Sequence, residues 1–294
     1  MKSFQWSLGV SCSDLSRENF EAFARAGIPG MEISLAAKDY AGIAWKEVDR
    51  YSAESGVRLF SFHLPFSYGE ANLASFDPGV TEKTLVWFEN LLGYIGELRI
   101  PIAVVHASSE PIQPWVREEY LKRAEASLAA LAGFGKKNGV TIAVENLPRT
   151  CLGNCSSEIL RLISVDDSLR VCFDTNHLLD QTHEDFIRSV GDKIVTTHIS
   201  DYDFRDERHW MPGDGKIRWD AVVAALREVG YRGNFTYEVS RRSNRSIERP
   251  KTVSLSELRE NYEAIMEGRT PSPLGTPIEE FCRSHVYYGE PKIR

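Results

Sequence analysis

Eight alternations of a short apolar segment with a longer helical segment run through this chain. The apolar segments are rich in Val, Ile, Phe and Thr and predict strands near 6–12, 30–34, 57–63, 102–106, 140–145, 169–174, 193–199 and 233–239. Helices are expected near 17–26, 44–55, 78–97, 115–137, 156–165, 182–190, 219–229 and 255–267. Short, continuous apolar runs are typical of parallel strands buried on both faces. Eight strand–helix units therefore predict an α/β fold, the closed (β/α)8 TIM barrel.

The length of the chain fits one such domain. Its 294 residues exceed the usual domain size, but α/β barrels commonly reach about 250 residues as a single domain. The stretch that begins near Thr270 carries Pro271, Pro273 and Pro277 and has the character of an extended arm. We expect residues 1–269 to form the barrel and residues 270–294 to form a C-terminal arm packed on it.

The charge and composition of the chain indicate its cellular compartment and exclude some classes of binding partner. The net charge of −7 and the pI near 5.6 argue against a broad surface for nucleic acid. Polar residues interrupt the N-terminal MKSFQWSLGVSCSD before a signal-type apolar core forms, and no stretch approaches the ~20 apolar residues of a membrane helix. Five scattered cysteines, an odd number, fit a reducing compartment. We expect a cytoplasmic protein without a membrane or nucleic-acid partner; the oligomeric state stays open, a homo-oligomer included.

Ionisable side chains stand at the ends of six of the expected strands. They are His63 in LFSFHLP, His106 in IAVVHAS, Glu145 in VTIAVEN, Asp174 in RVCFDTNH, His198 in IVTTHIS and Glu238 in NFTYEVS. In a barrel of this kind the carboxyl ends of the strands meet at one mouth, where active sites are built. The six residues therefore predict a functional site.

Four of these residues, on four consecutive strands, favour a metal site. Glu145, Asp174 and Glu238 would repel one another strongly in a partly desolvated mouth unless a cation neutralised them. Oxygen ligands with the one imidazole of His198 suit Mn²⁺, Co²⁺ or Mg²⁺ and also admit Zn²⁺. We expect one divalent metal ion here.

Several short motifs carry a family resemblance. ENLP at Glu145, FDTNH from 173 to 177, HISD from 198 to 201, PGDG from 212 to 215 and YEV at Glu238 resemble the xylose-isomerase-like superfamily of sugar (phosphate) isomerases and epimerases. The resemblance spans nearly the whole chain in the right order. It implies that Glu145, Asp174, His198 and Glu238 bind one divalent metal. It also implies that Glu145 and Glu238 act as the acid/base pair and that His177 contacts substrate oxygens.

The chain also departs from that pattern. Cys151 stands where the epimerases carry a second glutamate, and Arg205 is the nearest equivalent of their arginine after the seventh strand. In the long 201–215 loop, Trp210 either stacks on a sugar face or anchors the loop on the barrel rim. The residues expected to bind substrate are His63, His106, His177, Asp201, Arg205, His209 and Trp210. Glu32 is expected to be a structural carboxylate outside the metal shell, and His183 and His285 to be surface residues.

The chemistry expected of this site is proton abstraction next to a carbonyl. Two carboxylates and a metal can form an enediolate from a small sugar and return the proton to either face or to the adjacent carbon. The predicted function is a metal-dependent sugar isomerase or epimerase. The alternatives are a keto-sugar or keto-glycoside lyase or an inosose dehydratase with the same site. A non-catalytic barrel is a third class, which the intact metal ligands disfavour.

A rival prediction comes from the apurinic endonucleases of the same superfamily. His63, His106, His177 and the 207–209 trio stand near the places where those enzymes hold extra zinc ions, with Glu207 in place of an aspartate. The acidic balance and the lack of basic loops with interleaved aromatics weigh against a nuclease.

Overall fold

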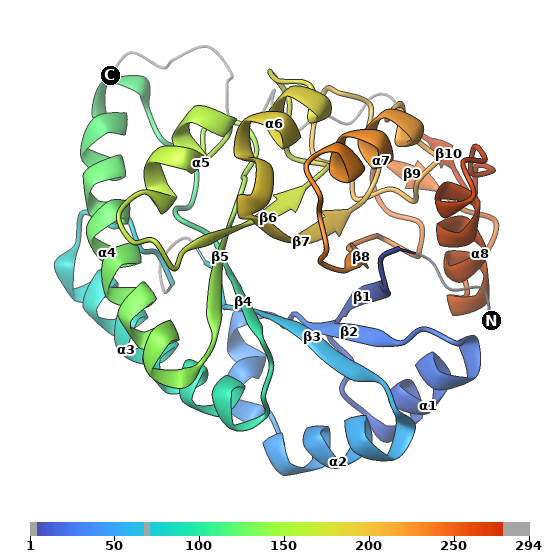
Figure 1. Ribbon diagram of the computed structural model, residues 1–294, viewed down its shortest axis with the longest axis horizontal. Coiled ribbons are helices and arrows are strands. Elements are labelled where there is room, and N and C mark those ends of the chain that lie inside the picture. The colour runs from blue at the N-terminus through green and yellow to red at the C-terminus, as the bar shows by residue number, and fades with distance from the viewer. Residues whose placement is uncertain (1–4, 68–70, 279–294) are drawn as a thin grey trace.

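The computed structural model describes residues 5–67 and 71–278. Eight parallel strands follow one another around a closed barrel, and the last pairs with the first (Figure 1). The barrel strands are β1 (Leu8–Cys12), β2 (Gly30–Ile33), β3 (Arg58–His63), β4 (Ile102–Val105), β5 (Thr141–Glu145), β6 (Arg170–Asp174), β7 (Ile194–Ile199) and β8 (Phe235–Tyr237). The predicted α/β class and the (β/α)8 barrel are confirmed.

Helices surround the barrel on its outer side (Figure 1). They are α1 (Arg17–Ala26), α2 (Trp45–Ser55), α3 (Pro78–Glu97), α4 (Arg117–Asn138), α5 (Ser156–Ile163), α6 (His183–Val190), α7 (Trp219–Glu228) and α8 (Leu255–Met266). Three short 3-10 turns lie at Ala37–Gly42, Pro114–Val116 and Gly191–Lys193. Gly27 and Gly139 end α1 and α4 in the left-handed conformation, each with φ of 67°, which a glycine adopts without a Cβ clash.

The interior of the barrel is layered. Val104 of β4, Ala143 of β5 and Cys172 of β6 form a small buried cluster. A separate and much larger hydrophobic core includes the residues packed between the strands and the helices. Strand side chains alternate between faces, so the residue two positions further along points to the same side. From Ala143 that residue is Glu145, and from Cys172 it is Asp174. The apolar layer therefore forms the floor of the polar site above it.

The loops at the carboxyl ends of β7 and β8 are fastened to the segment that follows α8. Strand β9 (Ile247–Glu248) pairs antiparallel with β10 (Thr276–Pro277). The carboxylate of Asp214 accepts the backbone N–H groups of Leu274 and Gly275 and pairs with Arg249 at 2.8 Å. The described part of the expected arm, 270–278, thus lies against these two loops. Residues 279–294, with His285, fall outside the described residues, and the domain boundary at 269 stays a prediction.

Two further observations concern expectations drawn from the sequence. Within the described residues, no helix combines the length and apolar character that crossing a bilayer requires. His183 is buried rather than at the surface: its Nε2 lies 2.6 Å from the carbonyl oxygen of Thr175, and its ring packs edge-on against Phe173. The surface expectation was wrong because His183 opens α6 on the face that covers the barrel.

Candidate active site

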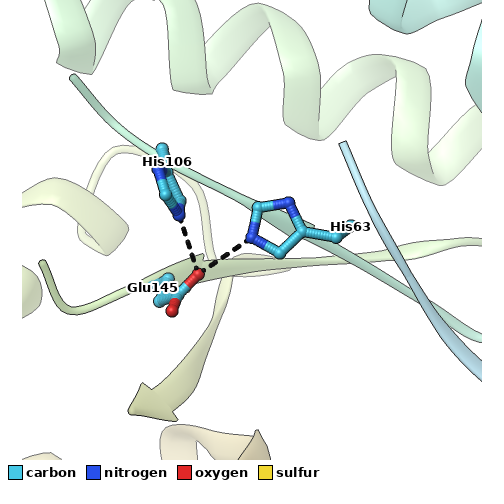
Figure 2. A group of neighbouring side chains, drawn as sticks. All are labelled: His63, His106 and Glu145. Atoms are coloured by element: carbon cyan, nitrogen blue, oxygen red, sulfur yellow. Dashed lines mark hydrogen bonds and ion pairs between the residues drawn. The ribbon is translucent and has the colours of Figure 1, made fainter. Parts of the chain in front are cut away.

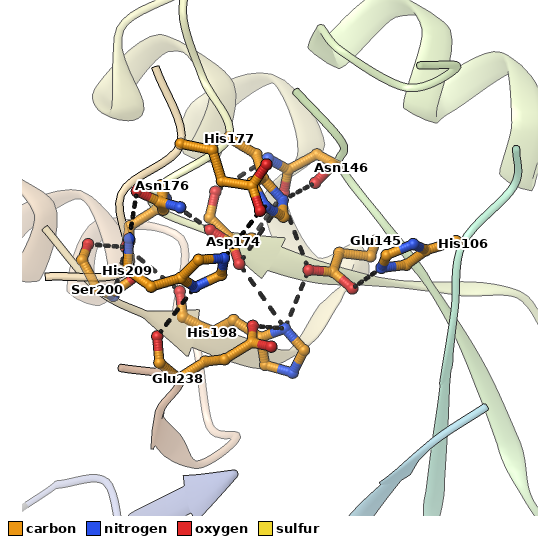
Figure 3. Close-up of polar contacts among 12 residues, drawn as sticks. His106, Glu145, Asn146, Asp174, Asn176, His177, His198, Ser200, His209 and Glu238 are labelled. Carbon is orange, nitrogen blue, oxygen red and sulfur yellow. Dashed lines mark hydrogen bonds and ion pairs between the residues drawn. The ribbon is translucent and has the colours of Figure 1, made fainter. Parts of the chain in front are cut away.

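Four ligand-type side chains converge at the carboxyl end of the barrel. Glu145 ends β5, Asp174 ends β6, His198 lies on β7 and Glu238 follows β8. One ligand atom from each lies within 4.8 Å of the others (Figure 3). The Nδ1 atom of His198 is 3.0 Å from Glu145 Oε1, 3.0 Å from Glu238 Oε2 and 3.8 Å from Asp174 Oδ2. These four residues are called the quartet below.

The quartet carries an electrostatic conflict that a cation would resolve. Glu145 and Asp174 are buried, and Asp174 Oδ2 has no hydrogen-bond partner. Burial, reinforced by the charges of Glu145 and Glu238, raises the pKa of Asp174 to about 7. An orphaned carboxylate oxygen among like charges is costly in a protein interior. The residues present therefore fit a divalent cation held by Glu145 Oε1, Asp174 Oδ2, His198 Nδ1 and Glu238 Oε2.

A buried carboxylate orients the imidazole of the quartet. Glu32, on β2, lies 2.9 Å from His198 Nε2 and also accepts a hydrogen bond from Ser61 Oγ. Glu32 can accept the proton of Nε2, so a cation in the quartet would take the place of the proton on Nδ1, which faces Glu145 and Glu238 at 3.0 Å. Glu32 thus lies outside the quartet, as the sequence led us to expect, and contacts it through His198.

The second oxygen of Glu145 faces two more histidines. Glu145 Oε2 lies 3.1 Å from His63 Nε2, at the end of β3, and 3.1 Å from His106 Nε2, just after β4 (Figure 2). Phe66 stacks on the His106 ring with centroids 4.3 Å apart. Burial opposes ionisation of Glu145, but His198 and His106 outweigh it and hold the pKa of Glu145 well below its ordinary value.

A third group of ligand type lies beside the quartet. His209 Nε2 is 2.9 Å from Glu207 Oε1, and His177 Nε2 is 3.8 Å from the same oxygen. Burial disfavours protonation of His177, but Asp174 and Glu207 outweigh it and raise its pKa to about 10. Burial is likewise outweighed at His209, where Glu207 raises the pKa to about 9. Figure 3 shows both rings next to the quartet.

Arg149 joins three loops next to this group. The residue follows β5, and its side chain is 3% exposed. Its guanidinium donates to Glu110 after β4, to Asp206 Oδ1 at 2.8 Å and to Glu207 Oε2 at 2.8 Å. Burial lowers the pKa of Arg149, but these carboxylates outweigh it and keep the group cationic. The βα loops after β4, β5 and β7 are therefore held together by one buried cation.

The quartet opens onto a cavity of about 320 Å³. Of the residues predicted from the sequence, five line it: His106, Glu145, His177, His209 and Glu238. Asp174 and His198 lie beneath its floor with no exposed side-chain surface. His63 is buried behind Glu145. The wall also contains Phe66, Glu110, Arg149, Cys151 and Glu207.

Four predicted substrate contacts are corrected by the geometry. His63 is buried behind Glu145 and does not line the cavity. Trp210 is buried and donates its indole N–H to Ser246 Oγ at 2.9 Å, so it anchors the loop instead of stacking on a ligand. The Asp201 carboxylate is buried and accepts N–H groups from the 213–217 turn and from Trp219. Arg205 is exposed and does not line the cavity. Asp201 was chosen from the HISD motif, and Arg205 and Trp210 from the loop that follows it. Neither a motif nor a position in a long loop fixes where the loop folds.

Phe66, Glu110 and Arg149 were not predicted as site residues. Phe66 follows the strand-end His63 by three positions, and an aromatic residue there was a usable signal. Glu110 and Arg149 are 39 positions apart and meet only because β4 and β5 are neighbours. Their pairing leaves no local pattern in the sequence.

Comparison with known proteins defines the family. A model described as the xylose isomerase-like TIM barrel matches residues 20–262. The chain therefore belongs to the xylose isomerase-like TIM barrel family. Within the solved structures, a D-tagatose 3-epimerase-like protein has a TM-score of 0.75 and 23% identity, with coverage of 89% of this chain and 97% of that chain. At that identity the likeness is one of fold.

Three similar sequences carry different names. An uncharacterized protein of Methanocaldococcus jannaschii is 28% identical over 229 residues, which cover 74% of this chain and 73% of that protein. D-psicose 3-epimerase of Enterocloster bolteae is 25% identical over 197 residues, 64% of this chain and 63% of the epimerase. The probable endonuclease 4 of Thermoplasma acidophilum is 27% identical over 199 residues, 61% of this chain and 66% of that protein. The alignments leave about a third of each of the last two proteins unmatched.

Proposed function

We propose that this protein is a divalent-metal-dependent sugar isomerase or epimerase. The observation that carries the proposal is the quartet, in which the orphaned Asp174 Oδ2 and the like-charged Glu145 and Glu238 fit a cation. The similarity to a ketose epimerase supports the sugar as substrate. Mn²⁺, Co²⁺, Mg²⁺ and Zn²⁺ all suit this ligand set. We place the activity in the cytoplasm, in keeping with the composition.

The residues of the cavity supply the proton chemistry. A bound divalent ion polarises a carbonyl and makes the neighbouring C–H bond more acidic. Glu238, whose side chain is 26% exposed on the cavity wall, takes the proton from that carbon, and the electron pair passes into the enediolate. His63 Nε2, 3.1 Å from Glu145 Oε2, supplies the proton that Glu145 returns to the opposite face, which gives the epimer. Return to the adjacent carbon gives an isomer, and loss of a β-substituent gives the lyase product.

Cavity-lining imidazoles complete the substrate site in this proposal. His106, His177 and His209 line the cavity and offer ring nitrogens to hydroxyl groups. His177 Nδ1 is fixed by the carbonyl oxygen of Asn146 at 2.9 Å, so Nε2 is the atom left to face Glu207 and the substrate.

The test measures whether the transferred proton exchanges with solvent. Incubation of the Mn²⁺-loaded protein in D₂O with a panel of ketoses, D-psicose and D-fructose included, should place deuterium on the carbon next to the carbonyl. Glu238→Gln should suppress this exchange about 10²-fold or more while the protein keeps its fold. Product formed without solvent label would point to a hydride shift and would contradict the acid/base roles of Glu145 and Glu238.

A second candidate function is a metal-dependent endonuclease acting at abasic sites. The observation that favours it is the presence of two further ligand groups around the quartet, His63–His106–Glu145 and His177–Glu207–His209. Together the three groups provide the dense shell that multinuclear sites require. Against it, Glu207 already neutralises Arg149, and the acidic cavity wall would repel DNA phosphates. The number of bound metal ions separates the two functions.

A further inference from the structure

Carboxylates outnumber the cationic side chains around the cavity. Four carboxylates line it, those of Glu110, Glu145, Glu207 and Glu238. Asp174 and Asp206 lie buried directly behind this wall, against His198 and Arg149. Among the described residues of the lining, Arg149 is the one lysine or arginine. His177 and His209 add cationic character to the lining, and both face the Glu207 carboxylate. A divalent ion bound by the quartet would be offset by the three carboxylates of the quartet itself, those of Glu145, Asp174 and Glu238.

The guanidinium of Arg149 is already paired with neighbouring carboxylates. Its Nε lies 2.9 Å from Glu110 Oε1, its Nη1 is 2.8 Å from Asp206 Oδ1 and its Nη2 is 2.8 Å from Glu207 Oε2. Every guanidinium nitrogen thus faces a carboxylate. A phosphate or carboxylate on a substrate would have to displace one of these pairs, and it would do so among like charges.

The rest of the wall suits a neutral carbohydrate. Phe66 is 49% exposed and presents an aromatic face against which the C–H face of a sugar can pack. Ser108 and Ser109 line the same cavity with the carboxylates, and all of these groups can hydrogen-bond to hydroxyls. Carboxylates that repel an anion accept hydrogen bonds from an uncharged polyol.

We infer that the site takes an uncharged sugar and rejects phosphorylated or otherwise anionic ones, with Glu110 and Glu207 as the specificity-determining residues. The inference rests on the proposed sugar chemistry and names its substrate class. The two carboxylates act in two ways: they occupy the cation that would bind a phosphate, and they repel the phosphate directly.

The test compares binding of matched neutral and anionic probes to the Mn²⁺-loaded protein by isothermal titration calorimetry. The probes are D-fructose, D-fructose 1-phosphate, D-fructose 6-phosphate and sulfate. The wild-type protein should bind D-fructose at least about tenfold more tightly than either phosphate ester, and sulfate more weakly still. The double variant Glu110→Gln/Glu207→Gln should lose most of that preference and gain about tenfold in sulfate affinity.

Control variants distinguish the effect of charge at the cavity from a general effect of charge or of misfolding. Each glutamine keeps an amide oxygen for Arg149, and Asp206 still holds the guanidinium, so the loops stay joined. If the double variant fails to fold, Glu110→Gln alone should show a smaller gain, about threefold, in sulfate affinity. Glu118→Gln removes the same charge from an exposed pair with Arg161 on the outside of the barrel and should change neither affinity.

Two results would overturn the inference: wild-type protein that binds a phosphate ester as tightly as D-fructose, or a folded double variant with unchanged sulfate affinity. Failure of D-fructose to bind at all would instead count against the sugar assignment. The sulfate titrations would still decide the role of Glu110 and Glu207 in that case.

Discussion

His198 is held from two sides, and this fixes the orientation of its imidazole ring in the quartet. Its Nδ1 faces the carboxylates of the quartet, while its Nε2 faces Glu32, which is itself fixed by Ser61. Outer carboxylates of this kind raise the basicity of a ligating imidazole and fix its ring orientation. We therefore expect the charge of Glu32, which contacts the quartet only through the His198 ring, to contribute to the affinity for a cation.

Glu32→Gln is expected to weaken Mn²⁺ binding about 10-fold, because the amide still accepts the Nε2 proton but no longer carries the charge. Metal titration followed by calorimetry measures the effect without any assay of activity. Glu47→Gln, a half-exposed carboxylate on α2, serves as the control and should leave the affinity unchanged. Equal Mn²⁺ affinity in Glu32→Gln and wild-type protein would show that Glu32 has only a structural role in the barrel interior.

At the residue scale, what the sequence predicted well were side chains that end strands. Glu145, Asp174 and His198 meet because strand register in a closed barrel brings residues at strand ends to one layer. Loop residues follow no such rule. The 201–215 loop turns Trp210 and Asp201 inward and leaves Arg205 outside, and its course depends on contacts with Ser246 and Trp219 that lie far along the chain.

Among the elements, α8 shows how a helix can be anchored by sequence-local chemistry. Ser254 accepts the backbone N–H of Glu257, and the Glu257 carboxylate accepts the backbone N–H of Ser254, a reciprocal cap. Lys251 pairs with the same carboxylate at 2.8 Å. Helix α8 packs between α1 and α7 and completes the outer ring of helices. The cap at its first turn therefore stabilises a helix that holds this ring together.

Glu257→Gln is expected to lower the melting temperature at pH 7 and to matter progressively less in acid. Lys251, followed by the Ser254 hydrogen bonds, lowers the pKa of Glu257 from 4.5 to about 2. The stabilisation by the ionised carboxylate is therefore complete above pH 4.5 and is lost as the pH falls towards 2. Because glutamine can still complete the cap, the substitution removes only the charge near the helix N-terminus and the pair with Lys251, about 0.5 kcal/mol, or about 1–2 °C in a domain of this size.

Circular dichroism melts of wild-type and Glu257→Gln protein from pH 7 to pH 3.5 measure this difference. The matched substitution Glu260→Gln, in the same helix outside the cap, should give melts that track the wild type. A gap between wild-type and Glu257→Gln protein that widens in acid would contradict the role of the carboxylate.

For elements as a class, the sequence was a good guide. Every predicted boundary of the eight strands and eight helices lies within two residues of the observed one. The reason is that glycine stops such as Gly27 and Gly139 and short apolar runs are local signals. The pairing of β9 with β10 was not predicted, because two-residue strands carry too little pattern and their partners are separated by α8.

On the scale of the whole molecule, the barrel concentrates buried charge at one end. Glu145, Asp174 and Glu238 are gathered by the closure of the sheet, and the fold must bear their repulsion when no cation is bound. Removal of metal by a chelator should therefore abolish activity and lower the melting temperature by about 5–10 °C at metal concentrations near 100 times Kd. Readdition of Mn²⁺ or Co²⁺ should restore both, and full activity in metal-stripped protein would end the metal assignment.

The number of metal ions per chain distinguishes the sugar enzyme from the nuclease. Neighbouring ions in a multinuclear site are only about 3.5–4 Å apart and need free carboxylates to bridge them. In this protein Glu207 is paired with Arg149 and His209, so a cation placed there would compete with a fixed guanidinium. Elemental analysis of protein purified without added metal should give about one ion per chain.

His209→Ala should keep that ion, because His209 is not one of the quartet, while weakening substrate binding through the loss of a cavity-lining imidazole. Its KM for a turned-over ketose should rise with little change in metal content, and incubation of wild-type protein with abasic-site DNA should leave the strand intact. Because His209 belongs to the third ligand group, the nuclease hypothesis expects the opposite: two or three zinc ions, loss of zinc on substitution and cleavage at the abasic site. Observing that combination would replace the sugar assignment with the nuclease, since the acidic cavity would then bind DNA through bridging zinc ions.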